Sequence, residues 1–161
     1  MGKQRKQNRL GEYDYSQAGC YFVTVCTRNR ELLFWGKTVD APAVGADIIR
    51  PVPLNKTGQV VEQAICNISE VYDGVVVEKY VVMPNHVHLI LVIRGGRMVS
   101  APTVSTIVGG MKRWASRECG RPLWQKSFYD HIVRDENDFM TRWNYIDTNP
   151  ARWQDDEYCE G

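Results

Sequence analysis

The sequence has no apolar run long enough to span a bilayer, which takes about 20 residues. Its N-terminus, "MGKQRKQNRL", is basic and has no apolar stretch after it, so it does not have the pattern of a secretory signal peptide. Gly2 is followed by Lys6, where a myristoylation signal has Ser or Thr. Nothing in these features directs the protein out of the cytoplasm, and we expect it to act there.

The sequence also lacks any C-x-x-C pair, and its five cysteines are an odd number. This pattern does not indicate a disulfide framework or a zinc site, and it favours reduced, mostly buried thiols.

Neither sign of charge dominates, since the net charge is only +1, so a global charge argument for nucleic acid is excluded. Basic residues nevertheless gather at the start of the chain and again in a second region, and such clusters can meet phosphates. A solvated face explains such clusters more commonly. The second basic region contains Lys112, Arg113, Arg117, Arg121 and Lys126.

The order of apolar and turn-forming residues predicts one α+β domain spanning residues 1–161. Strand, helix, strand, strand, helix and strand match a ferredoxin-like antiparallel sheet (split βαβ) with two helices on one face. A seventh element, an added C-terminal helix, runs from near Asp135 to Pro150. The first six elements are predicted at 20–28, 55–71, 75–82, 86–93, 104–115 (where Gly109 and Gly110 weaken the helix) and 128–134. Residues 1–12 are interpreted as a basic flexible tail, 38–53 as a loop insertion and 154–161 as an acidic tail.

Histidine is scarce, and two of the three histidines lie one residue apart in the stretch "YVVMPNHVHLILVI". Because alternate residues of a strand share a face, His86 and His88 point together, on the side of Ile90. Two imidazoles at this spacing can bind one divalent cation. The alternative is two independent histidines, each satisfied by its own hydrogen bond.

The other face of this strand is wholly apolar, and we expect it to pack under the two helices. If the preceding turn pairs Val82 with His86, Glu78 lies on the histidine face as a further candidate ligand. The apolar face carries Val87, Leu89, Leu91 and Ile93.

The last helix carries a tyrosine outside its apolar stripe. At roughly 100° per residue, Tyr145 falls nearly opposite the apolar stripe, among polar and charged residues. An ordinary surface tyrosine would look the same. The stripe contains Phe139, Met140, Trp143 and Ile146, and the polar side contains Asp138, Arg142 and Asn149.

Four segments in order resemble the HUH single-tyrosine (Y1) transposases of the insertion-sequence 200-like superfamily, most closely its REP-associated branch. "PNHVHLIL" resembles the HUH motif, and "YIDTNP" resembles the signature of the tyrosine helix. The segments "YDYSQAGCYFVTVCTRNR" and "LWQKSFYDHIVRDENDF" also occur in the expected places. The resemblance covers residues 13–153.

The resemblance implies that His86 and His88 hold a divalent metal and that Tyr145 attacks DNA, leaving a 5′-phosphotyrosine. It implies that a polar side chain one turn later, here Asn149, completes the metal site. Many relatives have Gln at that position, so Asn shortens the reach, and Pro150 disfavours helical geometry at Asn149. The family uses Mg²⁺ or Mn²⁺, whereas ligand softness alone also allows Zn²⁺.

The implied partner is single-stranded or hairpin DNA in the cytoplasm of a prokaryotic cell, in association with the nucleoid. Lys112, Arg113 and Arg117 are candidates for phosphate contacts, and so is Arg142, which shares the polar side of Tyr145. Within the resemblance, the protein works either as a monomer or as a homodimer that exchanges its tyrosine helix.

Two other functions fit parts of the pattern. A replication-initiating or plasmid-mobilising nickase uses the same chemistry, and a ferredoxin-like binder of single strands needs no catalytic residue. Tyr129 is the rival nucleophile, and His131 is a rival ligand, although a strand tyrosine and a lone strand histidine are more often structural.

Overall fold

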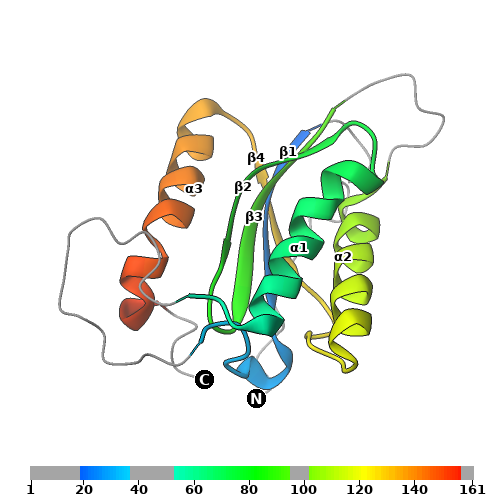
Figure 1. Cartoon of the computed structure of the whole chain (residues 1–161). Helices are drawn as coiled ribbons and strands as arrows, with labels where there is room; N and C mark the ends of the chain where they lie inside the picture. Colours follow the sequence, from blue (N-terminus) through cyan, green and yellow to red (C-terminus); the bar gives the residue numbers. More distant parts are fainter. Residues whose placement is uncertain (1–18, 37–52, 95–101, 157–161) are drawn as a thin grey trace, which may run out of the picture.

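The computed structural model describes residues 19–36, 53–94 and 102–156. Four strands form one antiparallel sheet in the order β2-β3-β1-β4. Two helices cover one face of the sheet, and a third helix lies on the other face (Figure 1). The strands are β1 (Gly19–Cys26), β2 (Val75–Val82), β3 (His86–Ile93) and β4 (Tyr129–Val133). The helices are α1 (Lys56–Val71), α2 (Val104–Cys119) and α3 (Glu136–Thr148), with short 3₁₀ segments η1 (Arg28–Arg30) and η2 (Pro150–Asp155).

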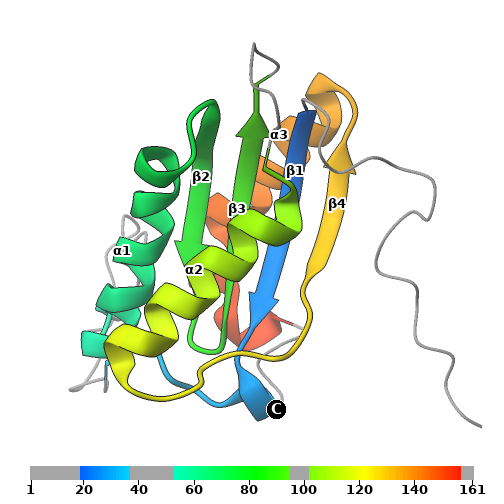
Figure 2. The same cartoon turned by 90° about the vertical axis from the view of Figure 1, so that its right-hand side faces the viewer.

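This arrangement confirms the predicted α+β, ferredoxin-like fold with an added C-terminal helix. The view turned by 90° shows α1 and α2 crossing the sheet in front and α3 behind it (Figure 2). The predicted tail 1–12 and insertion 38–53 lie outside the described residues, and the acidic tail is described only as far as residue 156. Within the three described ranges, no helix combines the length and the apolar character needed to cross a membrane.

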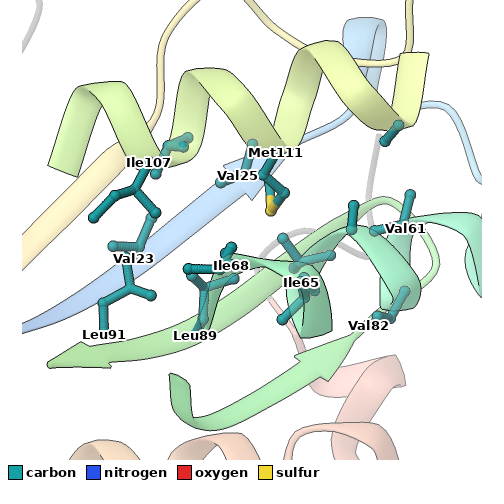
Figure 3. Packing of buried hydrophobic residues seen from close by; sticks show 14 of the residues in the cluster. Val23, Val25, Val61, Ile65, Ile68, Val82, Leu89, Leu91, Ile107 and Met111 are labelled. Carbon is teal, nitrogen blue, oxygen red and sulfur yellow. The ribbon is translucent and has the colours of Figure 1, made fainter. Parts of the chain in front are cut away.

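The main core lies between the sheet and the pair α1 and α2. Ile65 and Ile68 of α1 and Ile107 and Met111 of α2 point toward the strands (Figure 3). The predicted apolar face of β3 meets them, because Val87, Leu89, Leu91 and Ile93 are all buried in this cluster. Burying each such side chain stabilises the fold by about 1.5–3 kcal/mol before entropy costs, so this layer fixes the sheet on which the site is built.

The helix ends follow local capping chemistry. Each N-cap side chain accepts a hydrogen bond from the backbone three residues on: Asn55 from Gly58, Thr103 from Thr106 and Asp135 from Asp138. These bonds satisfy amides that have no partner inside the helix. The predicted start of the last helix is thereby confirmed.

The weakening expected from the two glycines of α2 does not break the helix. A Cβ at Gly110 would lie 2.5 Å from the Tyr72 hydroxyl oxygen, so glycine leaves room for the Tyr72 side chain against α2. The Tyr72 hydroxyl donates to the Thr106 carbonyl at 3.2 Å across this contact.

The predicted register of the hairpin is wrong by one residue. Met83, not Val82, lies opposite His86, since the turn consists of Pro84 and Asn85 alone and Met83 N–H donates to the His86 carbonyl at 2.8 Å. A one-residue slip exchanges the two faces of a strand. The pairing also shifts between Val77 and Lys79, which leaves Glu78 exposed at the irregularity. Lys79, paired with Ile90, therefore lies on the histidine face, and Glu78 does not join the site.

The expectation of mostly buried thiols is also wrong. Among the described residues, Cys20, Cys26 and Cys119 are partly exposed, Cys66 is exposed, and none of the four forms a disulfide. Burial raises the pKa of Cys20 to about 11, so its thiol stays protonated at neutral pH.

Candidate active site

The two histidines lie on the middle of the sheet, facing α3. His86 and His88 are 0% and 1% exposed, and strand β1 pairs Cys26 with His86 and Thr24 with His88. Their Nε2 atoms face each other at 3.0 Å. Two nitrogens bound to one cation at about 2.1 Å would lie about 3.0–3.4 Å apart, so the spacing fits a shared ion.

The remaining nitrogen of each ring is held by a neighbour. Asn85 Nδ2 donates to the Arg30 carbonyl at 3.4 Å, so its Oδ1 is the atom that accepts from His86 Nδ1 at 2.8 Å. This bond leaves a lone pair on His86 Nε2. Thr24 Oγ1 lies 2.8 Å from His88 Nδ1 and can either donate or accept. His88 can therefore give a proton to His86 or offer its own Nε2 lone pair to a cation.

Both imidazoles are neutral at physiological pH. Burial lowers the pKa of His86 to about 4, although the Asp156 carboxylate opposes this shift. Burial, the neighbouring His86 and the Arg142 guanidinium lower the pKa of His88 well below its usual value. Neutral imidazole is the form that binds metals, so the site keeps its ligands ready without deprotonation.

Helix α3 places Tyr145 against the histidines of its own chain. The ring centroids of Tyr145 and His88 are 5.2 Å apart, and those of Tyr145 and Phe22 are 6.1 Å apart. Tyr145 is 37% exposed, so one side of the ring remains open. The tyrosine thus contacts the sheet on one side and solvent on the other.

The predicted division of α3 into opposite faces is only partly right. Ile146 is buried, and Phe139 and Trp143 pack against the same cluster, but Met140 is 45% exposed. Tyr145 does not point away from this stripe, because the sheet contacts both Ile146 and Tyr145. A helix lying on a sheet contacts it along a stripe at least 100° wide, and adjacent residues such as these two fit within it.

The candidate third ligand, Asn149, is 4% exposed and adopts the helical conformation, with φ −59° and ψ −44°. Asn149 thus has helical geometry although the following Pro150 was expected to disfavour it, and Pro150 begins the 3₁₀ segment η2. Asn149 Oδ1 is buried and makes no hydrogen bond of ordinary geometry to a described residue, yet Asn149 lies close enough to His86 to raise its pKa. A buried acceptor oxygen beside an imidazole fits a cation ligand.

Sequence reasoning missed Asp156, which was taken as part of an acidic tail. Asn149 Nδ2 donates to Asp156 Oδ2 at 2.8 Å, and this oxygen lies 3.9 Å from His86 Nε2. The ligand atoms of His86, His88 and Asp156 all lie within 4.8 Å of one another. No pattern in the sequence predicts this placement, since it depends on how η2 returns the chain to the sheet.

Three further polar residues are linked by hydrogen bonds on the helix that carries Tyr145 and on the neighbouring strand β4. His131 Nε2 lies 2.7 Å from Asp138 Oδ2, and Asp138 Oδ1 accepts from Arg142 Nε at 3.3 Å. The Arg142 guanidinium lies over the Phe22 ring, 5.1 Å from its centroid. The structure thus brings Arg142 to the site, while His131 binds a carboxylate and not the histidine pair.

The other three candidate DNA contacts lie on α2, in the layer on the opposite face of the sheet from α3. Arg113 and Arg117 are exposed, but Lys112 is partly buried and its ammonium donates to the Gln125 carbonyl at 2.7 Å. Burial lowers the pKa of Lys112. The structure therefore does not bring these residues together with Tyr145.

Comparisons with known proteins agree with this architecture. An uncharacterized protein of Haemophilus influenzae is 30% identical over an alignment of 175 residues. The alignment covers 95% of this chain and 92% of that protein. The chain belongs to the family of this Haemophilus protein. No family model matches the sequence.

Among solved structures, a REP-associated tyrosine transposase bound to a REP hairpin superposes with a TM-score of 0.64 and 24% identity, over 89% of this chain and 74% of that one. The fold is that of a tyrosine transposase, as the sequence resemblance predicted. A putative transposase of Deinococcus radiodurans R1 has 18% identity and a TM-score of 0.48, over 88% of this chain and 96% of that one.

Proposed function

We propose that this protein cuts and rejoins single-stranded DNA beside a hairpin, as a metal-dependent transposase that uses Tyr145 as its nucleophile. The carrying observation is the 5.2 Å between the Tyr145 and His88 ring centroids within one chain. A nucleophile beside a pair of neutral, inward-facing imidazoles is the arrangement that this chemistry needs.

His86, His88 and an oxygen from Asn149 or Asp156 would hold the cation. Oxygen ligands from an amide and a carboxylate beside two imidazoles suit Mg²⁺ or Mn²⁺, the ions that the family resemblance implies. When bound, the ion would polarise the phosphodiester and stabilise the negative charge that develops on it.

The reaction conserves the energy of the broken bond. Tyr145 Oη forms a bond to phosphorus as the bond from phosphorus to the 3′-oxygen breaks, and the phenol proton ends on the free 3′-OH. The product is a 5′-phosphotyrosine. Attack by another 3′-OH reverses the step, releases Tyr145 and joins the strands without ATP.

Arg142 would support this step from the same face of α3. It lies one turn before Tyr145, and its charge reaches the site strongly enough to lower the pKa of His88. Asp138 Oδ1 accepts a hydrogen bond from Arg142 Nε at 3.3 Å, so the guanidinium is oriented before DNA binds. Preorganised positive charge stabilises a pentavalent phosphate more than the starting diester.

The test is a covalent adduct. The purified chain is incubated with Mn²⁺ and a pool of single-stranded oligonucleotides that carry hairpins beside random sequence, and the mixture is run on a denaturing gel. The wild type is expected to give a DNA–protein band that nuclease trims to a phosphotyrosine peptide at residue 145. Tyr145→Phe should give none, and Tyr129→Phe, which alters the rival tyrosine, should keep it. An adduct formed by Tyr145→Phe would overturn the proposal.

A non-catalytic single-strand binder is a weaker explanation of the site. Such a protein needs an open sheet face on which bases stack, but Phe22 on the histidine face is 3% exposed beneath α3. At Phe22 that face is covered by the helix that carries the tyrosine. The chemistry also fits a nickase, and rejoining of the cleaved strand by a second oligonucleotide is the activity that a transposase adds.

A further inference from the structure

A pocket of about 230 Å³ opens beside the histidine pair, on the same face of the sheet. It lies between the end of β1, the segment η1 and the residues that lead into β4. Its volume is below the range of about 300–1,000 Å³ that suits drug-sized ligands, so it fits one small group. Thr24, Cys26, Arg30, Gln125, Ser127 and Tyr129 supply most of its wall.

Strand pairing joins this pocket directly to the site. Two of its wall residues, Thr24 and Cys26, are the β1 partners of His88 and His86, respectively. Thr24 Oγ1 also lies 2.8 Å from His88 Nδ1, so one residue both lines the pocket and makes a hydrogen bond with the imidazole. A group bound in the pocket would therefore lie next to a cation bound by the two histidines.

Arg30 is fixed in a conformation that arginine seldom adopts. Its φ is 55°, in the left-handed region, which costs a side chain with Cβ free energy unless the surroundings hold it there. Asn85 holds it, because Nδ2 donates to the Arg30 carbonyl while Oδ1 accepts from His86 Nδ1. The Asn85 amide thus links the backbone of Arg30, a residue of the pocket wall, to the ring of His86.

The remaining wall residues suit a nucleobase. Tyr129 pairs with Thr24, so its ring lies on the site face, and it is 43% exposed. An exposed aromatic ring can stack on any base. Gln125 and Ser127 are exposed and carry both donors and acceptors, which can read the edge of an unstacked base.

A basic hollow shares one wall residue with the pocket. Gln125 also lines a second hollow of about 480 Å³, whose walls include Lys112, Arg113, Arg117 and Lys126. The two hollows share Gln125 as a wall residue.

We propose that the pocket walled by Arg30, Gln125 and Tyr129 holds one unstacked nucleotide of single-stranded DNA next to the cleaved phosphate. Tyr129 stacks on its base, Gln125 reads the base edge and Arg30 contacts its phosphate. The pocket thereby sets which sequence is cut. This inference rests on the proposed DNA cleavage, and it assigns Tyr129 to binding and not to attack.

The test compares the sequences that are cut. Oligonucleotides captured as adducts from a random single-stranded pool are sequenced for the wild type and for Gln125→Ala, Tyr129→Ala and Tyr129→Phe. The wild type should prefer one base at a position adjoining the cut. Gln125→Ala should lose that preference, and Tyr129→Ala should lower affinity roughly tenfold to a hundredfold, with Phe restoring it. Gln63→Ala, on the exposed surface of α1, is the matched control.

Failure of this inference is distinct from failure of the proposed function. If the wild type forms adducts and Gln125→Ala and Tyr129→Ala leave base preference and affinity unchanged, the pocket is not a nucleotide site. If the wild type forms no adduct, the pool is tested for binding alone by fluorescence anisotropy. Binding that Tyr129→Ala weakens and Gln63→Ala does not then supports the pocket by itself, and equal binding by all variants overturns it.

Discussion

The ring of Tyr145 on α3 lies 5.2 Å from the ring of His88 on β3, edge to face, within one chain. Phe22 also lies between the helix and the sheet, and the Phe22 ring stacks on His88 with centroids 5.2 Å apart. The proposed nucleophile and the proposed metal ligands thus pack together within one copy. We infer that a monomer is competent for cleavage.

A mixing experiment tests this inference. Tyr145→Phe supplies intact histidines, and His86→Ala supplies an intact tyrosine. If each chain builds its own site, the mixture forms no more adduct with DNA than either variant alone. Restored adduct in the mixture would show that α3 is exchanged between two copies, and light scattering would then detect the dimer.

Metal binding is predicted to depend on the histidine pair. His86→Ala or His88→Ala should abolish Mn²⁺ binding measured by electron paramagnetic resonance, because each removes one of two nitrogens that face each other at 3.0 Å. His131→Ala is the matched control, since its ring binds Asp138 and not the pair. Mn²⁺ affinity that falls equally in all three variants would contradict the assignment.

The third ligand can be identified in the same assay. Asn149 has a buried oxygen that makes no hydrogen bond of ordinary geometry to the part of the chain that the structure describes, and Asp156 brings a carboxylate to within 3.9 Å of His86. We expect Asp156→Ala and Asn149→Ala each to weaken Mn²⁺ binding, and loss of a residue that only orients another ligand should cost about 10–100-fold. A loss in one variant that greatly exceeds this range marks the direct ligand. Unchanged affinity in both variants would exclude η2 from the site.

The sequence predicted the framework of this site well, because its periodic patterns report burial directly. The alternation in β3 placed His86 and His88 on one face, and the caps and stripes located all three helices. The hairpin register failed because the turn consists of Pro84 and Asn85 alone, which places Met83 and not Val82 opposite His86. The further shift of the pairing at Glu78 cannot be read from composition either. Thr24 and Asp156 escaped prediction for a related reason. Their roles come from pairing between strands and from the return of the chain after Pro150, which are tertiary contacts.

The hydrogen bonds that Asp138 makes with His131 and Arg142 predict that the folded state loses stability in acid. Burial raises the pKa of Asp138, but its hydrogen bonds with His131 and Arg142 outweigh burial and hold the pKa below the ordinary 3.8. A carboxyl group with a lowered pKa stabilises the folded state above its unfolded pKa, and this contribution is lost as the pH falls through the folded value. Asp138→Asn should therefore lower the urea midpoint at pH 6, and the difference from wild type should shrink below pH 4. A difference that stays constant with pH would contradict this origin.

The basic residues of α2 are predicted to act unequally on DNA. Arg113 and Arg117 are exposed, so Arg113→Ala or Arg117→Ala should weaken binding of single strands and reduce the dependence of log affinity on log salt by about 0.7 for each lost phosphate contact. Lys112 donates to the Gln125 carbonyl at 2.7 Å, so Lys112→Ala should instead loosen the segment before β4 and lower the thermal midpoint. Fluorescence anisotropy across a salt series measures the first effect, and calorimetry measures the second. A full salt effect in Lys112→Ala at unchanged stability would show that its ammonium leaves Gln125 to bind phosphate.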